Sequence, residues 1–410
     1  MFIDNGARRS YIAVLVTYAL DLIGFSIVFP VLAPLFLHPM YGFFPAETSE
    51  LFRTTMLGVA FALFSLAQFF AAPMLGAAAD HIGRRKVFLI TIALSVVGYG
   101  VLALSVMWDN LWLLLLGRLW TGSCSGNAAI AQSAVADIAY PEHRAKAFGY
   151  LNGIGGVGFV VGPFLGGLLA EPEWLGGSIP FLFVGAVSIL NLLIVYAFFS
   201  ETYLPHAEGP LMKGLVRSFR NLHLVFQMPA LRTMILLYFV FLAADSMFLT
   251  FLPTYFVQRF NLKPDLIGDI YAYTSIIWMV MLLVINRELL KWCSLRVLSL
   301  WGSLVFGLSV ILMMLMPNPW WILPVLVPAV AGAALAYSNM GAMVSHAAPP
   351  DYQGRALGAS TSALSLSQIA ASLLAGPLAG LNDYLPLSVG AACALLTALL
   401  LTNRRCAGDT

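Results

Sequence analysis

Twelve long apolar stretches dominate the chain and restrict its fold more than any other feature. Each stretch is nearly free of charged side chains, and a helix needs about 20 apolar residues to cross the hydrocarbon core of a bilayer. We therefore expect an all-α membrane protein with twelve transmembrane helices. The expected spans are residues 11–37, 54–75, 87–107, 111–136, 147–170, 179–199, 231–256, 266–286, 295–316, 320–345, 356–379 and 386–402.

Composition excludes the main alternatives to this fold. Apolar residues make up 60% of the 410 residues and charged residues 10%, whereas soluble proteins carry about 25% charged residues. The apolar runs are continuous rather than alternating, which argues against a transmembrane β-barrel. A net charge of +2 implies no basic surface for nucleic acid. The four cysteines are scattered and the histidines show no metal-ligand spacing, so we expect no metal site and no bound cofactor.

The positions of the basic residues predict the topology. If both termini are cytoplasmic, that side holds every lysine and arginine except Arg53, Arg259 and Lys263 on the other side and Arg118 inside a span. Cytoplasmic loops of membrane proteins carry such an excess of basic residues. The sequence therefore predicts a multi-pass protein with an even number of spans and both termini in the cytoplasm.

The chain divides into two halves of six spans. We expect a first bundle at residues 1–200, a cytoplasmic linker at 201–228 and a second bundle at 229–410. The segment 141–149 (Pro-Glu-His-Arg-Ala-Lys-Ala-Phe-Gly) opens the fifth span, and 350–358 (Pro-Asp-Tyr-Gln-Gly-Arg-Ala-Leu-Gly) opens the eleventh, 209 positions later. Such pseudo-symmetric repeats are typical of transporters, whose binding site lies near the midplane between the repeats.

The loop after the second span carries a motif with a recognisable spacing. It reads Gly76-Ala-Ala-Ala-Asp80-His-Ile-Gly83-Arg84-Arg85-Lys86. This sequence resembles the signature of the major facilitator superfamily, with His81 where arginine is common. The resemblance implies that Asp80, Arg84 and Asp137 form a conformational latch between the two halves. The residues that we assign to this conformational motif are Gly76, Asp80, Gly83, Arg84, Arg85 and Asp137.

Three further segments narrow the resemblance to the drug:proton antiporter branch of that family. The fifth span resembles its antiporter motif, Gly-x8-Gly-x3-Gly-Pro-x2-Gly-Gly. The fourth span, with Leu115-Leu-Gly-Arg118, resembles its buried-arginine motif. The first span, with Leu20-Asp21-Leu-Ile-Gly24, resembles the bacterial tetracycline-type exporters, a likeness that is clearest in the N-terminal half. The antiporter motif comprises Gly149, Gly158, Gly162, Pro163, Gly166 and Gly167.

The resemblance implies a major facilitator fold, a monomer, and residence in the bacterial cytoplasmic (inner) membrane. It also implies alternating access driven by a proton gradient, with a small-molecule substrate, protons and the lipid bilayer as the partners. Tetracycline exporters have a functional aspartate in the third and ninth spans. Residues 87–107 and 295–316 of this chain contain no acid, so tetracycline itself is not implied as the substrate.

Three ionisable residues are placed deep in the membrane: Asp21, Arg118 and Asp245. Charge at this depth is costly and commonly serves function. Desolvation favours the neutral form of a carboxyl group, so either aspartate can load a proton near neutral pH. We expect Asp21 and Asp245 to carry or relay protons and Arg118 to tune them or contact substrate. The alternative is structural: an aspartate bonded to a neighbouring helix, or an arginine bonded to backbone carbonyls.

Further residues can line a substrate cavity. Aromatic rings near the charges suit an amphipathic compound, although such rings also serve in packing, and amides within spans usually face protein or a cavity. The candidates are Phe25, Asn127, Gln132, Asn152, Phe248 and Asn339.

The predicted function is proton-coupled efflux of a small amphipathic compound by a secondary active transporter. One alternative keeps the fold and changes the cargo to an endogenous metabolite such as a siderophore; another is a proton-coupled importer of a small nutrient. A membrane enzyme is not expected, because no Ser/His or metal-ligand constellation falls within the spans. A receptor would need room for a soluble signalling domain, which the short loops do not provide.

Overall fold

The structure is a computed structural model that describes residues 5–171, 173, 175–202, 228–349 and 352–403. Within these ranges the chain is almost entirely helical and contains no β-strand. Most of the predicted linker, together with residues 350 and 351 of the repeated motif, lies outside the described residues.

The N-terminal half begins with a bent first span. The polypeptide turns at residues 27–28, just before Pro30, which stands at the start of the second helix, where a proline is tolerated. The long helices of this half are α1 (Asn5–Ser26), α2 (Phe29–Leu37), α3 (Glu50–Ile82), α4 (Arg84–Met107), α5 (Leu111–Cys124), α6 (Asn127–Ile138), α7 (Arg144–Leu169) and α8 (Ile179–Phe198).

The C-terminal half follows the same plan with different irregularities. Its first span remains one helix through Pro253, and its second span contains a π-helical turn at Met281–Ile285. The helices are α10 (Pro229–Phe260), α11 (Pro264–Val280), α12 (Asn286–Leu289), α13 (Leu295–Met314), α14 (Pro319–His346), α15 (Gln353–Leu381) and α16 (Leu385–Thr402).

The described residues contain eleven helical segments long and apolar enough to cross a membrane. The twelfth crossing is the pair α5 and α6, each of which is too short to span alone. The prediction of one continuous span over 111–136 is therefore wrong in detail, because the helix breaks at Ser125 and Gly126. Glycine and serine are weak helix formers. Eleven intact spans and one broken span confirm the predicted twelve-helix architecture.

The outer surface suits a bilayer. Large apolar side chains, including Leu190, Leu193 and Leu399, are exposed, as expected where lipid replaces water. Exposed tryptophans cluster at helix ends, where amphipathic rings favour the membrane interface. Those at helix ends are Trp108, Trp112, Trp292, Trp320 and Trp321, whereas exposed Trp120 and Trp301 lie within α5 and α13. The protein is a multi-pass membrane protein.

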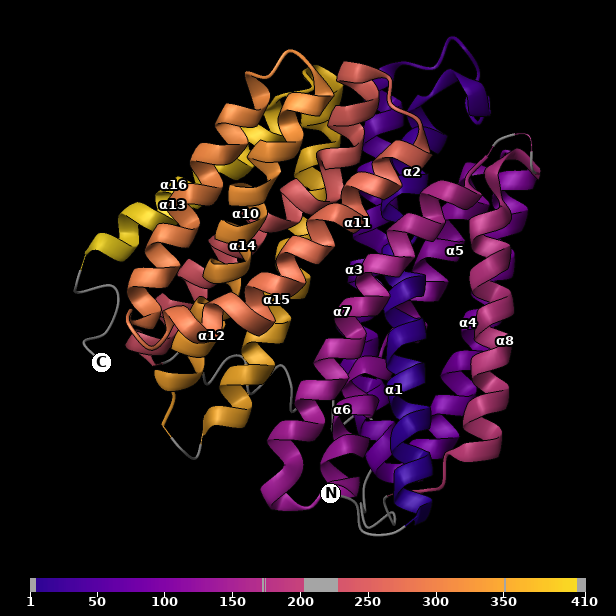
Figure 1. Cartoon of the computed structure of the whole chain (residues 1–410). Helices are drawn as coiled ribbons and strands as arrows, with labels where there is room; N and C mark the ends of the chain where they lie inside the picture. Colours follow the sequence, from indigo (N-terminus) through magenta and orange to yellow (C-terminus); the bar gives the residue numbers. More distant parts are fainter. Residues whose placement is uncertain (1–4, 172, 174, 203–227, 350–351, 404–410) are drawn as a thin grey trace.

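The two halves form two groups of helices that meet at one end of the molecule (Figure 1). We call the end with Asn5, Gly83, Glu201 and Thr402 the terminal face, and the end with His38, Ser49 and Asn261 the opposite face. The helix pairs α3–α15 and α7–α11 provide the most extensive packing between the halves.

The contacts described between the halves lie between the opposite face and the middle of the helices. Gln258 Nε2 donates to Glu50 Oε1 at 2.8 Å near the opposite face. Farther from the opposite face, where α3 packs against α15, Ser65 Oγ lies 3.5 Å from Gln368 Oε1. Phe29 stacks on Tyr271 with 6.0 Å between ring centroids. The helices diverge toward the terminal face (Figure 1), so the structure is closed at the opposite face.

Candidate functional site

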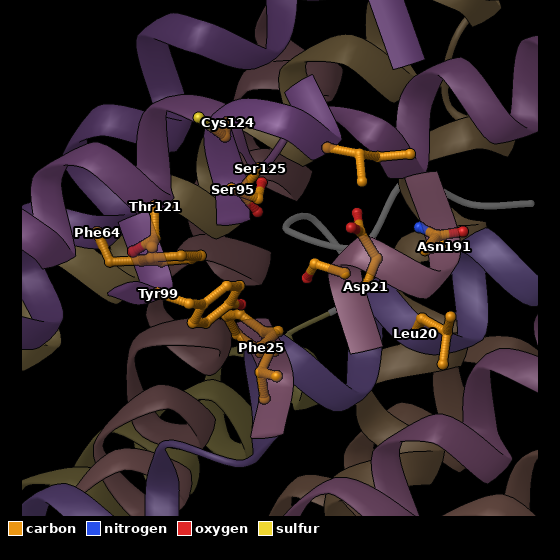
Figure 2. Close-up of a pocket in the computed structure, with 13 residues that line it drawn as sticks. Leu20, Asp21, Phe25, Phe64, Ser95, Tyr99, Thr121, Cys124, Ser125 and Asn191 are labelled. Carbon is orange, nitrogen blue, oxygen red and sulfur yellow. The ribbon is translucent and has the colours of Figure 1, made fainter. Parts of the chain in front are cut away.

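Asp21 projects into a cavity inside the N-terminal half (Figure 2). The cavity is enclosed by α1, α3, α4, α5 and α8. This position differs from the site between the halves that the repeats predicted. The lining residues are Leu20, Asp21, Phe25, Phe64, Ile92, Ser95, Tyr99, Thr121, Cys124, Ser125, Val184, Ser188 and Asn191.

An amide from another helix holds the Asp21 carboxylate. Asn127 Nδ2 donates to Asp21 Oδ1 at 3.0 Å, and Thr91 Oγ1 donates to Asn127 Oδ1 at 2.6 Å. An amide presents a donor and an acceptor on opposite sides, so the bond from Thr91 orients the donor toward Asp21. Asn127 is buried, with 2% of its surface exposed. Three helices, α1, α4 and α6, thus meet at one carboxylate.

The break in the fourth span creates this contact. Because the helix stops at Cys124 and restarts at Asn127, the amide stands in the first turn of α6. The N-terminal end of a helix carries partial positive charge and favours an anion. Gln68 Nε2 donates to the Ser125 carbonyl at 3.2 Å and to Ser125 Oγ at 3.0 Å. Irregular backbone within a membrane needs such partners.

Arg118 forms no described ion pair. Its Nε donates to the Ala60 carbonyl at 3.2 Å, and its guanidinium lies 4.5 Å from the ring centroid of Phe64 and 5.7 Å from that of Phe61. Only 4% of the residue is exposed. These contacts match the structural alternative of an arginine bonded to backbone. A direct contact between Arg118 and substrate is not supported in this conformation.

Asp245 lies in the middle of α10, in surroundings unlike those of Asp21. Among the described residues, no hydrogen bond or ion pair to its carboxylate is found. Tyr238 lies seven residues before it, two turns away on the same face of α10. The two aspartates are therefore not equivalent, although each lies in the first span of its half.

The motif at the terminal face forms a network of charge and hydrogen bonds. Arg84 Nε pairs with Asp137 Oδ2 at 2.5 Å, and its Nη1 lies 3.5 Å from Asp80 Oδ1. Glu201 accepts from the backbone N–H groups of Arg84 at 2.9 Å and Arg85 at 3.1 Å, capping α4. Asp80 and Asp137 belong to the N-terminal half, and Glu201 is the first residue of the predicted linker. A latch between the two halves stays a prediction.

Gly83 in this motif has a conformation that requires glycine. Its φ is +97°, and a Cβ there would meet the Glu201 carboxylate. Gly76 has open space beside it, so close packing does not explain a glycine at that position. Arg85 Nη2 donates to the Tyr196 carbonyl at 2.6 Å.

The antiporter motif forms two packing surfaces on α7. Gly158 and Gly162 lie against the backbone of α1, and Gly166 lies against Ile27 in the turn before α2. Gly167 lies against Pro264 and Gly268 of α11 in the other half. Small residues allow this approach between membrane helices. Gly149 has nothing near its missing side chain, and α7 continues through Pro163.

The remaining candidates differ in position. Phe25 lines the cavity and Asn127 adjoins it. Phe248 is buried, packs edge-on against Phe306 with 5.4 Å between centroids, and does not line the described cavity, so its role in a substrate cavity stays a prediction. Gln132 and Asn152 are exposed and do not line the described cavity.

Asn339 also lies away from the cavity. It is buried and donates from Nδ2 to Asn286 Oδ1 at 2.9 Å, which joins α14 to the start of α12. Its assignment as a cavity-lining residue is therefore not supported by the described pocket.

Several contacts escaped sequence reasoning. Tyr99, Asn191 and Ser95 line the cavity, and Tyr18 lies close enough to Asp21 to interact electrostatically with it. The sequence did offer a signal for these residues: they are polar side chains in spans that contain no acid, and a tyrosine or serine in a membrane helix usually forms a hydrogen bond with another helix. Only the tertiary structure shows which of them face Asp21.

The family model of the Major Facilitator Superfamily matches residues 14–372. The chain belongs to the Major Facilitator Superfamily. It is a membrane transporter for a small molecule rather than an enzyme, so these two predictions and the predicted fold are confirmed.

Curated relatives of this major facilitator protein include resistance proteins. The class H tetracycline resistance protein of Pasteurella multocida is 27% identical over 90% of this chain and 88% of its own length. The class G protein of Vibrio anguillarum is 28% identical over 89% of both chains. The quinolone resistance protein NorA of Staphylococcus aureus is 26% identical over 85% of this chain and 87% of its own.

Solved structures share the fold. The human organic anion transporter MFSD10 superimposes with a TM-score of 0.69 at 21% identity, covering 97% of this chain and 100% of that one. A D-xylose-proton symporter gives 0.72 at 15% identity, covering 95% and 96%. At this identity the likeness concerns the major facilitator fold alone.

Proposed function

We propose that this major facilitator protein exports a small amphipathic compound from a bacterial cell in exchange for protons. It acts as a monomer in the inner membrane, with both termini cytoplasmic, and the proton gradient supplies the energy without a bound cofactor. The observation that carries the proposal is the Asp21 site. A carboxyl group stands at mid-membrane in a polar cavity, bonded to an amide and with no described cation beside it.

Asp21 is suited to exchange one proton per cycle. The hydrogen bond from Asn127 and the N-terminal end of α6 favour the carboxylate. Burial away from bulk water favours the neutral acid. Because these two effects oppose each other, a small rearrangement of the surrounding helices can change whether Asp21 is charged or neutral. Gain of a proton weakens the pull between α1 and α6, which couples proton binding to the packing of the N-terminal half.

The conformation fits the intracellular stage of export. The opposite face is closed by the Gln258–Glu50 bond and by close helix packing. With both termini cytoplasmic, the helices diverge toward the cytoplasm (Figure 1). A transporter in this state receives a compound from the cell interior and releases a proton there.

The relatives support export over import. Two named groups of relatives are resistance proteins, for tetracycline and for quinolones, and removal of a compound from the cell explains such resistance. Export of an endogenous metabolite remains the main alternative, whereas nutrient import has no support among these relatives. Neither α4 nor α13 contains an acid, so we do not propose tetracycline as the natural substrate.

The proposal can be tested first in cells. The full chain is expressed in a strain without its main drug exporters, and growth is measured with tetracycline, norfloxacin, ethidium and tetraphenylphosphonium. We expect increased resistance to at least one compound. Unchanged sensitivity to the panel, together with intracellular depletion of a metabolite that the strain normally retains, would favour endogenous export.

Proton coupling is tested with purified protein in proteoliposomes. The vesicles contain the compound that gave resistance, and an inward-directed proton gradient is imposed. We expect accelerated efflux from vesicles with the wild-type protein. Asp21→Asn should lose the acceleration while retaining exchange of labelled for unlabelled compound. Gradient-driven efflux by Asp21→Asn, with an unaltered pH dependence, would refute the coupling role.

A further inference from the structure

The cavity beside Asp21 contains more hydrogen-bonding groups than the bond from Asn127 uses. Asp21 Oδ1 accepts that bond, and no other described residue bonds to the carboxylate, so Oδ2 is available to the cavity. Tyr99 and Ser188 also line the cavity, and among the described residues no hydrogen bond to either hydroxyl group is found. A carboxylate oxygen and two hydroxyl groups therefore share one space with hydrogen bonds still to make.

Contacts with α1 place Tyr99 and Asn191 on either side of Asp21 along the helix axis. The Tyr99 hydroxyl oxygen lies over Gly24, where an added Cβ would stand only 2.5 Å from it. Asn191 Oδ1 accepts a hydrogen bond from Thr17 Oγ1 at 2.8 Å. Gly24 follows Asp21 by three residues and Thr17 precedes it by four, so all three share one helix face. The hydroxyl group thus stands about 4.5 Å from Asp21 toward the opposite face, and the amide about 6 Å toward the terminal face.

The bond from Thr17 also orients the amide of Asn191. Both residues are buried, with 1% and 3% of their surfaces exposed. Because Thr17 occupies the amide oxygen, the amide nitrogen turns toward the Asp21 side of the cavity (Figure 2). An amide nitrogen carries two donor hydrogens. Asn191 therefore presents donors to the same space that Tyr99 and Asp21 face.

The size of the cavity suits water and excludes a larger molecule. Its volume is about 30 Å³, whereas a buried water needs about 10–15 Å³ and two to four polar partners. The cavity therefore has room for about two water molecules. The polar partners that it offers them are Asp21, Tyr99, Ser188 and Asn191. The rings of an amphipathic compound such as norfloxacin do not fit into this volume.

The ionisable groups around this space leave Asp21 as its proton acceptor. Tyr99 and Cys124 line the cavity from α4 and α5, and Tyr18 is near Asp21 on α1. Arg118 of α5 is turned toward α3 instead. The lining residues that α3 and α8 contribute are not ionisable. Tyrosine and cysteine ordinarily ionise above neutral pH, so the carboxyl group is the one that exchanges a proton with water near neutral pH.

We propose that the cavity beside Asp21 binds water that delivers the proton, with Tyr99 and Asn191 as the positioning residues that hold this water. A hydronium ion in the cavity transfers one proton to Asp21 Oδ2 and becomes water, and the reverse step releases the proton. The inference rests on the proposed export function and names the proton path at its site. The exported compound binds outside this cavity. Proton and compound therefore influence each other through the packing of α1 and α6, not by competing for one carboxylate.

Hydroxyl-radical labelling of the purified full-length protein tests for the water. A short X-ray pulse converts bound water into hydroxyl radicals, which oxidise the side chains beside it, and mass spectrometry locates the products. We expect oxidation of Tyr99 and Cys124. Tyr271 and Phe306 are buried and do not line the described cavity, so they should stay unmodified. Absence of oxidation at both Tyr99 and Cys124 would overturn the proposal.

A side chain that fills the cavity distinguishes bound water from bulk water. Ser188→Leu adds aliphatic atoms to the cavity wall and should abolish the oxidation of Tyr99. Ser123→Leu, on the exposed side of α5, is the matched control and should leave the oxidation unchanged. Persistent oxidation of Tyr99 in Ser188→Leu would show that the radicals come from bulk water, which would overturn the proposal.

The same variant tests whether proton and compound occupy separate sites. In proteoliposomes Ser188→Leu should lose the acceleration of efflux by a proton gradient. Equilibrium binding is measured with tetracycline, norfloxacin, ethidium and tetraphenylphosphonium, and Ser188→Leu should bind each of them as the wild-type protein does. Weaker binding of any of these compounds in Ser188→Leu would place the compound in the cavity and overturn the separation of sites.

Two further variants test the positioning residues. Tyr99→Phe and Asn191→Leu should each lower gradient-driven efflux by about tenfold, the effect of one hydrogen bond of ordinary strength. The midpoint of the pH profile should rise, because a less hydrated carboxylate keeps its proton to higher pH. Exchange of labelled for unlabelled compound and the unfolding temperature should not change. Tyr150→Phe, which removes an exposed hydroxyl group of α7, is the control. Wild-type efflux and an unchanged midpoint in both variants would refute the positioning roles.

The outcomes separate this inference from the export proposal. Oxidation of Tyr99 in a protein that shows no gradient-driven efflux refutes export but retains the water site. Gradient-driven efflux that Ser188→Leu leaves at the wild-type level refutes the water site but leaves export intact. If Ser188→Leu does not fold, the comparison of Tyr99→Phe with Tyr150→Phe still tests the proposal.

Discussion

Gly167 of α7 lies directly against Gly268 of α11, so the two halves of the protein meet there backbone to backbone. Gly376 of α15, 209 positions after Gly167, makes the equivalent contact with Gly58 of α3. The spacing is the same as that between the repeated segments at 141–149 and 350–358. In sequence, the pair Gly376-Pro377 resembles the pair Gly162-Pro163, but it lies five residues later than the 209-residue spacing would place it. The structure instead makes Gly376 the counterpart of Gly167.

This pair of crossings predicts that bulk at Gly167 opens the opposite face. In Gly167→Val the side chain would meet backbone atoms of Pro264 and Gly268, which cannot move aside easily. Overpacking costs about 1–3 kcal/mol, which shifts the ratio of closed to open forms by about five- to 150-fold. Distances between spin labels at Glu47 and Leu381, both exposed near this face, should lengthen and broaden.

Gly100→Val is the control for this experiment, because Gly100 is also within a helix but has open space beside it. Its label distances should match those of the wild-type protein. Equal distances in Gly167→Val and wild type would show that the crossing does not keep the face closed.

A second prediction concerns the hydrogen bond between Asn127 and Asp21. The bond favours the charged carboxylate, so Asn127→Ala should let Asp21 keep its proton to higher pH. Hydrogen bonds to charged groups contribute about 1.5–3 kcal/mol, and one pH unit corresponds to about 1.4 kcal/mol. We expect the midpoint of the pH profile of proton-driven efflux to rise by about one unit. Asn152→Ala, which removes an exposed amide of α7, should leave the midpoint unchanged.

A third prediction is that Arg118 acts mainly on stability. Arg118→Lys retains the charge but loses the flat contact with Phe64 and the geometry of the bond to the Ala60 carbonyl. Together these contacts are expected to contribute about 1–3 kcal/mol. Thermal unfolding of the purified protein should shift down by several degrees, whereas exposed Arg287→Lys should not change it. A normal unfolding temperature with an altered pH profile of efflux would instead indicate electrostatic tuning.

A fourth prediction concerns pH at the opposite face. Burial lowers the pKa of His38, and the nearby charge of Lys263 lowers it further, against a smaller raising effect of a backbone hydrogen bond at Asn261. Protonation of His38 is therefore disfavoured while the side chain stays buried and Lys263 of the other half remains close. The closed form should have its full stability above about pH 6.5, the usual pKa of histidine. It should lose stability as the pH falls below that value.

The measurement uses the same spin labels at pH 8 and pH 5. The open population of the wild-type protein should increase at pH 5, and His38→Gln should remove most of the change, because it removes the titrating group. A pH response that persists in His38→Gln would assign the effect to another group.

Much of the fold could be predicted because a bilayer restricts the choices. Length and apolarity determine a membrane span almost alone, and the basic residues indicate orientation. The break at Ser125 and Gly126 was missed because hydropathy does not detect a helix that stops and restarts with the same polarity. The break also depends on a residue distant in sequence. Gln68 of α3 donates hydrogen bonds to the Ser125 carbonyl and to Ser125 Oγ at the break.

The site was predicted less completely. Asp21, Asp245 and Arg118 stand out in sequence because charge within a span is rare. The sequence by itself therefore identified the ionisable groups within the membrane. It could not distinguish their roles. Arg118 meets a carbonyl and two rings of α3, and Asp21 meets an amide of α6, so these partners come from other helices.

The sequence determined the membrane topology, the family and the short set of buried charges, because each of these follows from local composition or local motifs. The tertiary structure alone decided that the cavity with Asp21 lies inside one half and that Gly167 and Gly376 are the paired crossings. The physical reason is that the chemistry of a buried charge depends on its partners. Those partners are brought together by helix packing across many residues of sequence.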